Sequence, residues 1–439
     1  MKKILIGIVS FIIVLVLIIW IVINNSDKSE QIDIETSEMT ATVLAVSDDA
    51  LTVQDRNNVI YTFNDFETDE VLSVGDYLTL SYTGDIDGDT EMQKASVVEC
   101  AKLDDSDIDV MMEDKSAFSV FYKQAVKLLN KMTLEEKAGQ VLLVAAPENG
   151  QAELLKENPY SGYILYKRDF DGKTARQVTN KIKSLQNASK IPLLIAVDEE
   201  GGKVVRVGTN NTLVPNGFKS PQELYKVGGM NAIKVDTIDK SKILHDLGIN
   251  LNLAPVVDVA TDPNAYIYYR TLGEDAETTA KYAETVVEAS KGTGVSYTLK
   301  HFPGYGNNKD THDGVVTDDT PYDDIISTNL VPFISGTKAG AEAVLFSHNI
   351  VKNVDSSNPA SLSASVHNLL RNNVGFSGIA ITDDLSMKAI TADDAIVKAL
   401  LAGNDLLILT DSTGSIDKIV SAVKNGTLDE KVVDKAALR

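Results

Sequence analysis

The chain has 439 residues, which is enough for one large domain and a small one. Its hydrophobic content of 44% is that of a protein with packed cores rather than of a disordered chain. The net charge of −22 argues against nucleic-acid binding and against docking on anionic lipid. A single cysteine, Cys100, excludes an intramolecular disulfide framework and a metal cluster held by several thiolates.

The N-terminus carries an apolar segment from Ile4 to Ile23, directly after two lysines. About 20 apolar residues span a bilayer as a helix, whereas the apolar core of a signal peptide has only about 7–15. No small-x-small cleavage site and no lipidation cysteine follow this segment. The sequence therefore predicts a transmembrane signal anchor over residues 1–24, with the lysines cytoplasmic and the rest of the chain outside the cell. A long, cleaved signal peptide is the alternative.

A small β module is predicted next, after a polar and acidic tether over residues 25–38. Residues 39–103 contain five short runs with strand character, separated by turn residues. Alternating side chains such as Tyr61 and Phe63 predict a half-buried sheet that closes toward a barrel of the oligonucleotide/oligosaccharide-binding type. The five runs are 41–46, 51–54, 59–63, 77–82 and 96–100.

The remaining residues, 108–439, alternate short apolar runs with helical stretches. Thr133 and Glu136 form a capping-box pattern at the start of one early helix. Eight apolar runs separated by helical stretches are typical of a (β/α)8 TIM barrel, so the predicted fold class is α/β. The runs are 141–144, 162–165, 193–197, 249–253, 296–299, 343–346, 378–382 and 406–409.

Charged residues directly follow several of these runs. Asp198, Lys300, His301 and Asp383 each come immediately after a predicted strand. The carboxyl ends of all barrel strands meet at one mouth, where barrel enzymes carry out their chemistry. We therefore expect these side chains to lie close together. His348 follows the sixth run and is a further candidate for this mouth.

A loop rich in glycine and asparagine carries Asp310, Thr311 and His312. An aspartate two residues before a histidine can accept a hydrogen bond from one ring nitrogen and so fix the tautomer. The other nitrogen is then available to transfer a proton near neutral pH. Taken alone, the triplet is equally typical of an ordinary polar loop.

Four segments share the order of motifs in a known enzyme family. They are VDEEGGKVVR at 197–206, APVVDV at 254–259 with RTLG at 270–273, KHFPGYGNNKDTH at 300–312, and ITDDLSM at 381–387. Together they resemble glycoside hydrolase family 3, in its bacterial β-N-acetylglucosaminidase subgroup. A set of four ordered motifs is far more specific than any one of them. The resemblance extends from about residue 108 onward and does not include the small β module.

The resemblance implies a retaining exo-β-N-acetylglucosaminidase. Such an enzyme removes terminal β-linked N-acetylglucosamine from peptidoglycan fragments or chito-oligosaccharides. The resemblance further implies that Asp383 is the nucleophile and that His312 is the general acid/base, oriented by Asp310. The residues implied to hold the sugar are Asp198, Arg206, Arg270, Lys300 and His301.

Local geometry leaves further roles open for neighbouring residues. Arg206 and Arg270 could also form structural salt bridges with Asp198 or Asp258. Asp384 points away from Asp383 if the backbone stays extended, because successive side chains of a strand face opposite sides. We therefore expect Asp384 to be a structural hydrogen-bond acceptor.

Other functions stay open at this point. A β-glucosidase and an N-acetylglucosaminide phosphorylase are the alternative enzymes, and a non-catalytic scaffold that binds the cell wall is the alternative of another class. No His, Cys and carboxylate cluster has metal-ligand spacing, so neither a metal nor a cofactor is expected. The expected partners are a carbohydrate substrate such as a muropeptide, and the membrane through the N-terminal helix. Nucleic acid is not expected, and the chain is expected to be monomeric. The predicted localisation is the bacterial cell membrane, with a single pass and an extracellular catalytic domain.

Overall fold

The computed structural model describes residues 37–47, 50–55, 60–64, 66, 68, 72, 77–84, 96–102, 117–306, 308, 310 and 314–439. The chain divides into two compact units, with the division at Lys102 and Leu103. The predicted anchor over residues 1–24 lies outside the described residues, as does the predicted tether up to residue 36. Within the described part, no helix has the length and apolar character needed to cross a membrane.

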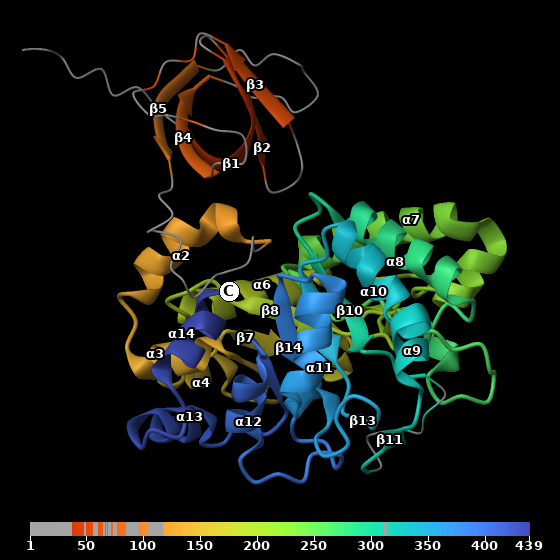
Figure 1. The fold of residues 1–439 in the computed structure, drawn as a ribbon. Coiled ribbons are helices and arrows are strands. Elements are labelled where there is room, and N and C mark those ends of the chain that lie inside the picture. Colours follow the sequence, from red (N-terminus) through yellow and green to blue (C-terminus); the bar gives the residue numbers. More distant parts are fainter. Residues whose placement is uncertain are drawn as a thin grey trace, which may run out of the picture. The chain divides into compact units, whose positions relative to one another are not determined.

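The smaller unit is a five-stranded sheet with the strand order β3-β2-β1-β4-β5. Each of the five predicted runs forms a strand, and the edge strands β3 and β5 contact each other, so the sheet curves toward closure (Figure 1). Alternate residues such as Leu51, Val53, Leu78 and Leu80 are fully buried, which explains why alternation predicted this sheet. The strands are β1 (Ser37–Val46), β2 (Ala50–Asp55), β3 (Ile60–Asn64), β4 (Tyr77–Thr83) and β5 (Ser96–Lys102).

The larger unit is an eight-stranded parallel barrel with the strand order β14-β12-β10-β9-β8-β7-β6-β15. A parallel bridge between Ile381 and Leu406 joins the two ends of this order and closes the ring. All eight predicted runs form strands, so the prediction of a (β/α)8 barrel is confirmed. The strands are β6 (Leu142–Ala145), β7 (Gly162–Ile164), β8 (Leu194–Val197), β9 (Leu251–Asn252), β10 (Ser296–Phe302), β12 (Ala343–Phe346), β14 (Ile379–Thr382) and β15 (Leu407–Leu409). A separate two-stranded sheet joins β11 (Thr317–Asp318) to β13 (Ile350–Val351).

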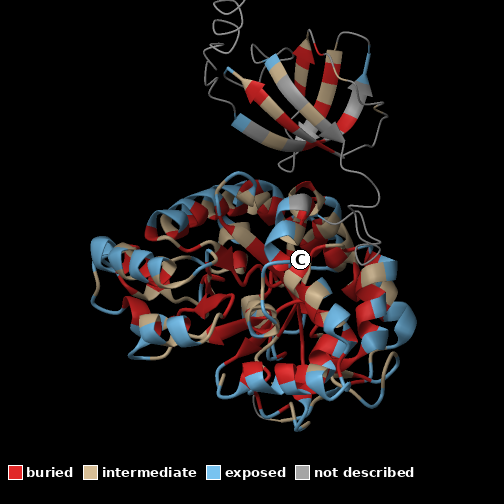
Figure 2. Cartoon of the chain, turned by 90° about the vertical axis from the view of Figure 1, so that its left-hand side faces the viewer, coloured by how far each residue is buried: buried red, intermediate tan, exposed pale blue. Residues whose placement is uncertain are grey.

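Both faces of the barrel strands are buried, as Figure 2 shows for the larger unit. Side chains such as Leu345 and Ile381 fill the interior of the barrel. Their neighbours in sequence, such as Val344 and Ala380, pack outward in the layer between strands and helices. Strands that are buried on both faces read as continuous apolar runs, which is why the sequence located them so closely.

Helices surround the barrel (Figure 1). The capping box is confirmed at the start of α3, where the Thr133 hydroxyl accepts a hydrogen bond from the Glu136 N–H and the Glu136 carboxylate accepts one from the Thr133 N–H. The helices are α2 (Tyr122–Leu129), α3 (Leu134–Gln140), α4 (Gln151–Glu157), α5 (Lys167–Phe170), α6 (Ala175–Ala188), α7 (Pro221–Leu247), α8 (Ala276–Ser290), α9 (Tyr322–Asp324), α10 (Val331–Lys338), α11 (Ala364–Asn368), α12 (Ala395–Ala402), α13 (Ser415–Lys424) and α14 (Glu430–Leu438).

Candidate active site

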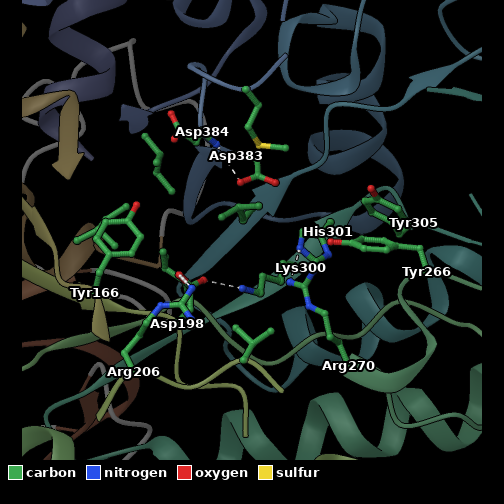
Figure 3. A pocket seen from close by; sticks show the side chains of 16 residues that line it. Tyr166, Asp198, Arg206, Tyr266, Arg270, Lys300, His301, Tyr305, Asp383 and Asp384 are labelled. Atoms are coloured by element: carbon green, nitrogen blue, oxygen red, sulfur yellow. Dashed lines mark hydrogen bonds and ion pairs between the residues drawn. The ribbon is translucent and has the colours of Figure 1, made fainter. Parts of the chain in front are cut away.

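A cavity of about 330 Å³ opens at the carboxyl ends of the barrel strands. Apolar side chains of the barrel interior, such as Leu345 and Ile408, form part of its lining. The polar lining includes six of the residues that the sequence singled out, and Figure 3 shows them around one space. The prediction that they lie together is confirmed, while their chemical roles stay predictions. The six are Asp198, Arg206, Arg270, Lys300, His301 and Asp383.

Lys300 and His301 reach the cavity from within a strand, and here the sequence prediction was wrong. The fifth strand was expected to end before Lys300, but β10 continues to Phe302. Its register with β12 shifts between Lys300 and Phe302. A regular strand sends successive side chains to opposite faces, so this irregularity allows both residues to line the cavity.

The segment after β8 places three successive carboxylates in two different surroundings. Asp198 faces the cavity, where its oxygens lie 2.9 Å from Lys300 Nζ and 3.2 Å from Arg206 Nη2. Glu199 points the other way, and its carboxylate accepts hydrogen bonds from the backbone N–H groups of residues 206–208. Glu199 therefore shapes the loop that carries Arg206, and the salt bridge anticipated between Arg206 and Asp198 is present.

Arg270 is paired with Glu200, and not with Asp198 or Asp258 as the sequence analysis had considered. Its Nε and Nη2 donate hydrogen bonds of 3.0 and 2.8 Å to the two carboxylate oxygens of Glu200. Burial of Glu200 opposes its ionisation, but the attraction of Arg270 and Lys300 outweighs burial and holds the pKa of this carboxyl well below its ordinary value. The sequence analysis missed Glu200. Its position two residues after Asp198, on the same side of an extended chain, was the available signal.

His301 is held by the buried carboxylate of Asp258, whose Oδ2 lies 2.7 Å from His301 Nδ1. The same carboxylate accepts hydrogen bonds from the backbone N–H groups of His301 and Tyr305. On the other side of the ring, Nε2 lies 3.2 Å from Arg270 Nη2. A guanidinium can only donate, so Nε2 accepts and the ring proton is on Nδ1.

Asp383 directly follows β14, as predicted, and Figure 3 shows its carboxylate pointing into the cavity. Its Oδ1 accepts a hydrogen bond of 2.9 Å from the N–H of Asp384. The carboxylate of Asp384 instead accepts hydrogen bonds from the backbone N–H groups of Ser386 and Thr410, and from the Thr410 hydroxyl. The expectation that Asp384 is a structural acceptor is confirmed, although Asp384 also forms part of the cavity lining.

His348 is fully buried and is not one of the described residues that line the cavity, so its placement at the mouth was wrong. Its Nε2 donates a hydrogen bond of 2.9 Å to the carbonyl oxygen of Asp384, and its Nδ1 lies 2.7 Å from the hydroxyl of Ser361. The ring therefore braces the backbone that carries Asp383. Burial raises the pKa of Asp383, but His348, His301 and the Asp384 N–H outweigh it and lower that pKa. The carboxylate is ionised at neutral pH.

The predicted acid/base pair follows β10 in the sequence. Asp310 is partly buried and its carboxylate is hydrogen-bonded to Tyr266, which lines the cavity. His312 lies outside the described residues, so its role stays a prediction.

In this arrangement the ionised carboxylate of Asp383 faces the cationic hydrogen-bond donors Lys300 and Arg270. Asp198 adds a hydrogen-bond acceptor to the same cavity. Among the described residues, no group of three or more His, Cys, Asp or Glu could hold a metal ion. Charged donors and acceptors around a small cavity can bind a ligand with many hydroxyl groups. A carboxylate in the same cavity can stabilise or capture a positively charged carbon centre.

Comparison with known proteins identifies the family. Residues 133–439 match the glycosyl hydrolase family 3 N terminal domain. The chain belongs to glycoside hydrolase family 3. This family 3 protein is therefore a glycoside hydrolase, and its barrel is the domain that the family shares.

Three relatives illustrate the similarity. Beta-hexosaminidase LpqI of Mycobacterium tuberculosis is 31% identical over 324 residues, which cover 69% of this chain and 81% of that protein. A family 3 beta-N-acetylglucosaminidase from Paenibacillus sp. superposes with a TM-score of 0.64 at 28% identity, over 70% of this chain and 61% of that one, which is less than two thirds of the relative. Beta-N-acetylhexosaminidase from Beutenbergia cavernae superposes with a TM-score of 0.60 at 28% identity, over 70% and 97% of the two chains.

Proposed function

We propose that this protein is a retaining exo-β-N-acetylglucosaminidase that removes terminal β-linked N-acetylglucosamine from peptidoglycan fragments or chito-oligosaccharides. One observation carries the proposal: Asp383 faces Asp198, Arg270 and Lys300 across a single cavity. Small-molecule pockets usually measure about 300–1,000 Å³, so this cavity suits one sugar residue at the end of a chain. Relatives named as beta-hexosaminidase and beta-N-acetylglucosaminidase support the choice of sugar.

The sugar is held through its hydroxyl groups. Asp198 accepts hydrogen bonds from them, while Lys300, Arg270 and Arg206 donate to their oxygens. His301 lines the cavity beside them and helps to hold the Arg270 guanidinium in place, because its Nε2 accepts from Arg270 Nη2 while its Nδ1 donates to Asp258. All these groups are already fixed by contacts with one another, so little side-chain freedom is lost when the sugar binds.

The chemistry proceeds in two displacements. Asp383 attacks the anomeric carbon while the glycosidic oxygen takes a proton and leaves, which forms a covalent glycosyl–enzyme. Water then attacks the same carbon, loses a proton to the enzyme and releases N-acetylglucosamine with its β configuration retained. The lowered pKa of Asp383 keeps the nucleophile ionised for the first step.

His312 supplies the proton in the first displacement and removes one from water in the second. Asp310 orients its ring. The contact between Asp310 and Tyr266 supports this assignment, because it places Asp310 beside a residue that lines the cavity.

The N-terminal segment tethers the enzyme to the outer face of the bacterial cell membrane. The apolar run from Ile4 to Ile23 is long enough for one span. Intact chain in the membrane fraction, with the barrel open to external protease, is the expected result. A mature N-terminus near Asn25 would replace the anchor by a cleaved signal peptide.

The enzymatic proposal is tested by turnover of an aryl N-acetyl-β-glucosaminide against the matching aryl β-glucoside, each with and without inorganic phosphate. We expect release of the aryl group from the first substrate only, with free N-acetylglucosamine as the sugar product in both buffers. Preference for the glucoside would indicate a β-glucosidase, and a sugar 1-phosphate would indicate a phosphorylase. Release from neither substrate would favour a non-catalytic scaffold that binds the cell wall.

A further inference from the structure

Glu200 lies at the centre of the contacts that hold the cations of the cavity. Its carboxylate accepts two hydrogen bonds from Arg270, and one of its oxygens lies 2.7 Å from Lys300 Nζ. Lys300 also lies 2.9 Å from Asp198, which in turn contacts Arg206. Three cations from three different segments are thus joined through two carboxylates.

Glu200 itself is out of reach of a bound sugar. Only 1% of its side chain is exposed, and it is not one of the described residues that line the cavity. Asp198, by comparison, lines the cavity and is 20% exposed. Any effect of Glu200 on the reaction must therefore act through Lys300 and Arg270.

Lys300 depends on its carboxylate neighbours for its charge. Its side chain is 3% exposed, and burial of an ammonium group favours the neutral amine. The groups that act on it are Glu200, Asp198 and, across the cavity, Asp383, which attract the charge, and Arg270, which repels it. Burial lowers the pKa of Lys300, but Glu200 and then Asp198 outweigh burial and raise it. Without Glu200, the remaining attraction comes from Asp198, which Arg206 shares, and from Asp383 across the cavity.

We propose that Glu200 is a positioning residue that keeps Lys300 protonated and fixes the guanidinium of Arg270, so that both can donate to the sugar. The inference rests on the proposed glycosidase activity and assigns it a residue that does not touch the substrate. Loss of the carboxylate should then weaken sugar binding at every pH. It should also make the enzyme sensitive to alkali, because Lys300 becomes a neutral amine at a lower pH.

The test is the pH profile of kcat/KM for E200Q and wild type, with a dinitrophenyl N-acetyl-β-glucosaminide as substrate. An activated leaving group departs without protonation, so titration of the acid/base does not shape the alkaline side of the profile. The matched control is E199Q, which makes the same change at the adjacent, equally buried carboxylate that contacts backbone N–H groups instead of cations.

We expect E200Q to lose about tenfold or more in kcat/KM at pH 7, and about tenfold more between pH 7 and 9.5. The kcat/KM values of wild type and of E199Q should not change over this pH interval, whatever their activity at pH 7. A profile for E200Q that runs parallel to that of the wild type would overturn the proposal, because a merely structural role lowers activity equally at all pH values. Turnover by the wild type tests the glycosidase proposal on its own. A wild type without turnover would contradict that proposal and would give no evidence against the role of Glu200.

E200D covers the case in which E200Q does not fold. Its carboxylate keeps the charge but is one methylene shorter, so it cannot retain all the contacts with Arg270 and Lys300. We expect an alkaline limb close to that of the wild type, with KM raised several-fold and kcat changed less. Wild-type KM in a folded E200D would contradict the positioning role.

Discussion

The two ends of the same barrel each hold a cavity, and they differ in where their charges point. The cavity at the carboxyl ends measures about 330 Å³ and that at the amino ends about 300 Å³. The lining of the amino-end cavity includes the first residues of several strands, such as Leu194, Leu251 and Ala343. Cavity size therefore does not distinguish the active end from the other.

At the amino end, the carboxylate of Asp405 is satisfied by two arginines and a backbone N–H. Asp405 accepts hydrogen bonds from Arg371 at 2.9 Å, from Arg439 at 3.0 Å and from the N–H of Ala380 at 2.8 Å. At the mouth, in contrast, the carboxylate of Asp383 is aimed at the cavity (Figure 3). The same barrel thus uses buried charge for structure at one end and presents it to a ligand at the other.

Replacing one aspartate at each end gives the largest expected contrast. D383N removes the proposed nucleophile, and we expect kcat to fall by at least about 10⁴-fold while the fold is kept. D405N should leave kcat per folded molecule within a few-fold of wild type. Steady-state kinetics with an aryl N-acetyl-β-glucosaminide measures both, and substantial activity in D383N would break the contrast.

Replacing one cation at each end should give a smaller contrast. K300M removes a proposed donor to the sugar and leaves Asp198 and Glu200 with fewer partners. We expect kcat/KM to fall by about 10²–10³-fold. R439M removes a cation of similar burial at the amino end and should change kcat/KM little once its folded fraction is corrected for. Equal losses in the two variants would mean that Lys300 acts only through stability.

For the free energy of unfolding, we expect the order of the two aspartate variants to be reversed. D405N leaves Arg371 and Arg439 without their shared carboxylate, and breaking such a buried pair should lower the free energy of unfolding by about 3 kcal/mol. D383N should lower it by less, because this carboxylate faces the cavity. Urea denaturation at pH 7 checks both values, and a larger loss for D383N would contradict the division of roles.

His367 offers a smaller, pH-dependent effect away from both cavities. It is buried against Phe346 with the two rings stacked at 3.9 Å, and burial lowers its pKa to about 4. The unfolded chain, with an ordinary pKa of 6.5, takes up the proton first as pH falls. The stabilising contribution of neutral His367 is therefore present above pH 6.5 and is lost toward pH 4.

H367F should remove this part of the acid sensitivity. We expect the free energy of unfolding of the wild type to fall between pH 6.5 and 4 more steeply than that of H367F, by at most about 1.4 kcal/mol per pH unit. Denaturation curves at several pH values measure the difference, and identical slopes would show that His367 titrates normally. Activity at pH 7 should be little changed, since His367 does not line the cavity.

The sequence located the barrel well because its strands are short apolar runs, and it located most of the mouth because charged residues follow those runs. The sequence prediction failed where charged residues belong to a strand. Lys300 and His301 belong to β10, yet charged residues at a strand's end read as loop. Only tertiary packing buries them.

Partners that are distant in sequence were also missed. Glu200 meets Arg270 and Lys300 from 70 and 100 residues away, and no local pattern encodes such a pairing. The tie between Asp258 and His301 likewise depends on two neighbouring strand ends. Local periodicity predicts which side chains face the mouth. Which carboxylate pairs with which cation follows only from the three-dimensional arrangement.

Covalent trapping of the nucleophile tests the central claim most directly. A 5-fluoro analogue of an activated aryl N-acetyl-β-glucosaminide should form a glycosyl–enzyme that hydrolyses slowly, and peptide mass spectrometry then locates the attached sugar. We expect a single sugar on the peptide that contains Asp383, no labelling in D383N, and return of activity as the sugar is released. Attachment at Asp384, or labelling that persists in D383N, would contradict the assignment of the carboxylate that faces the cavity.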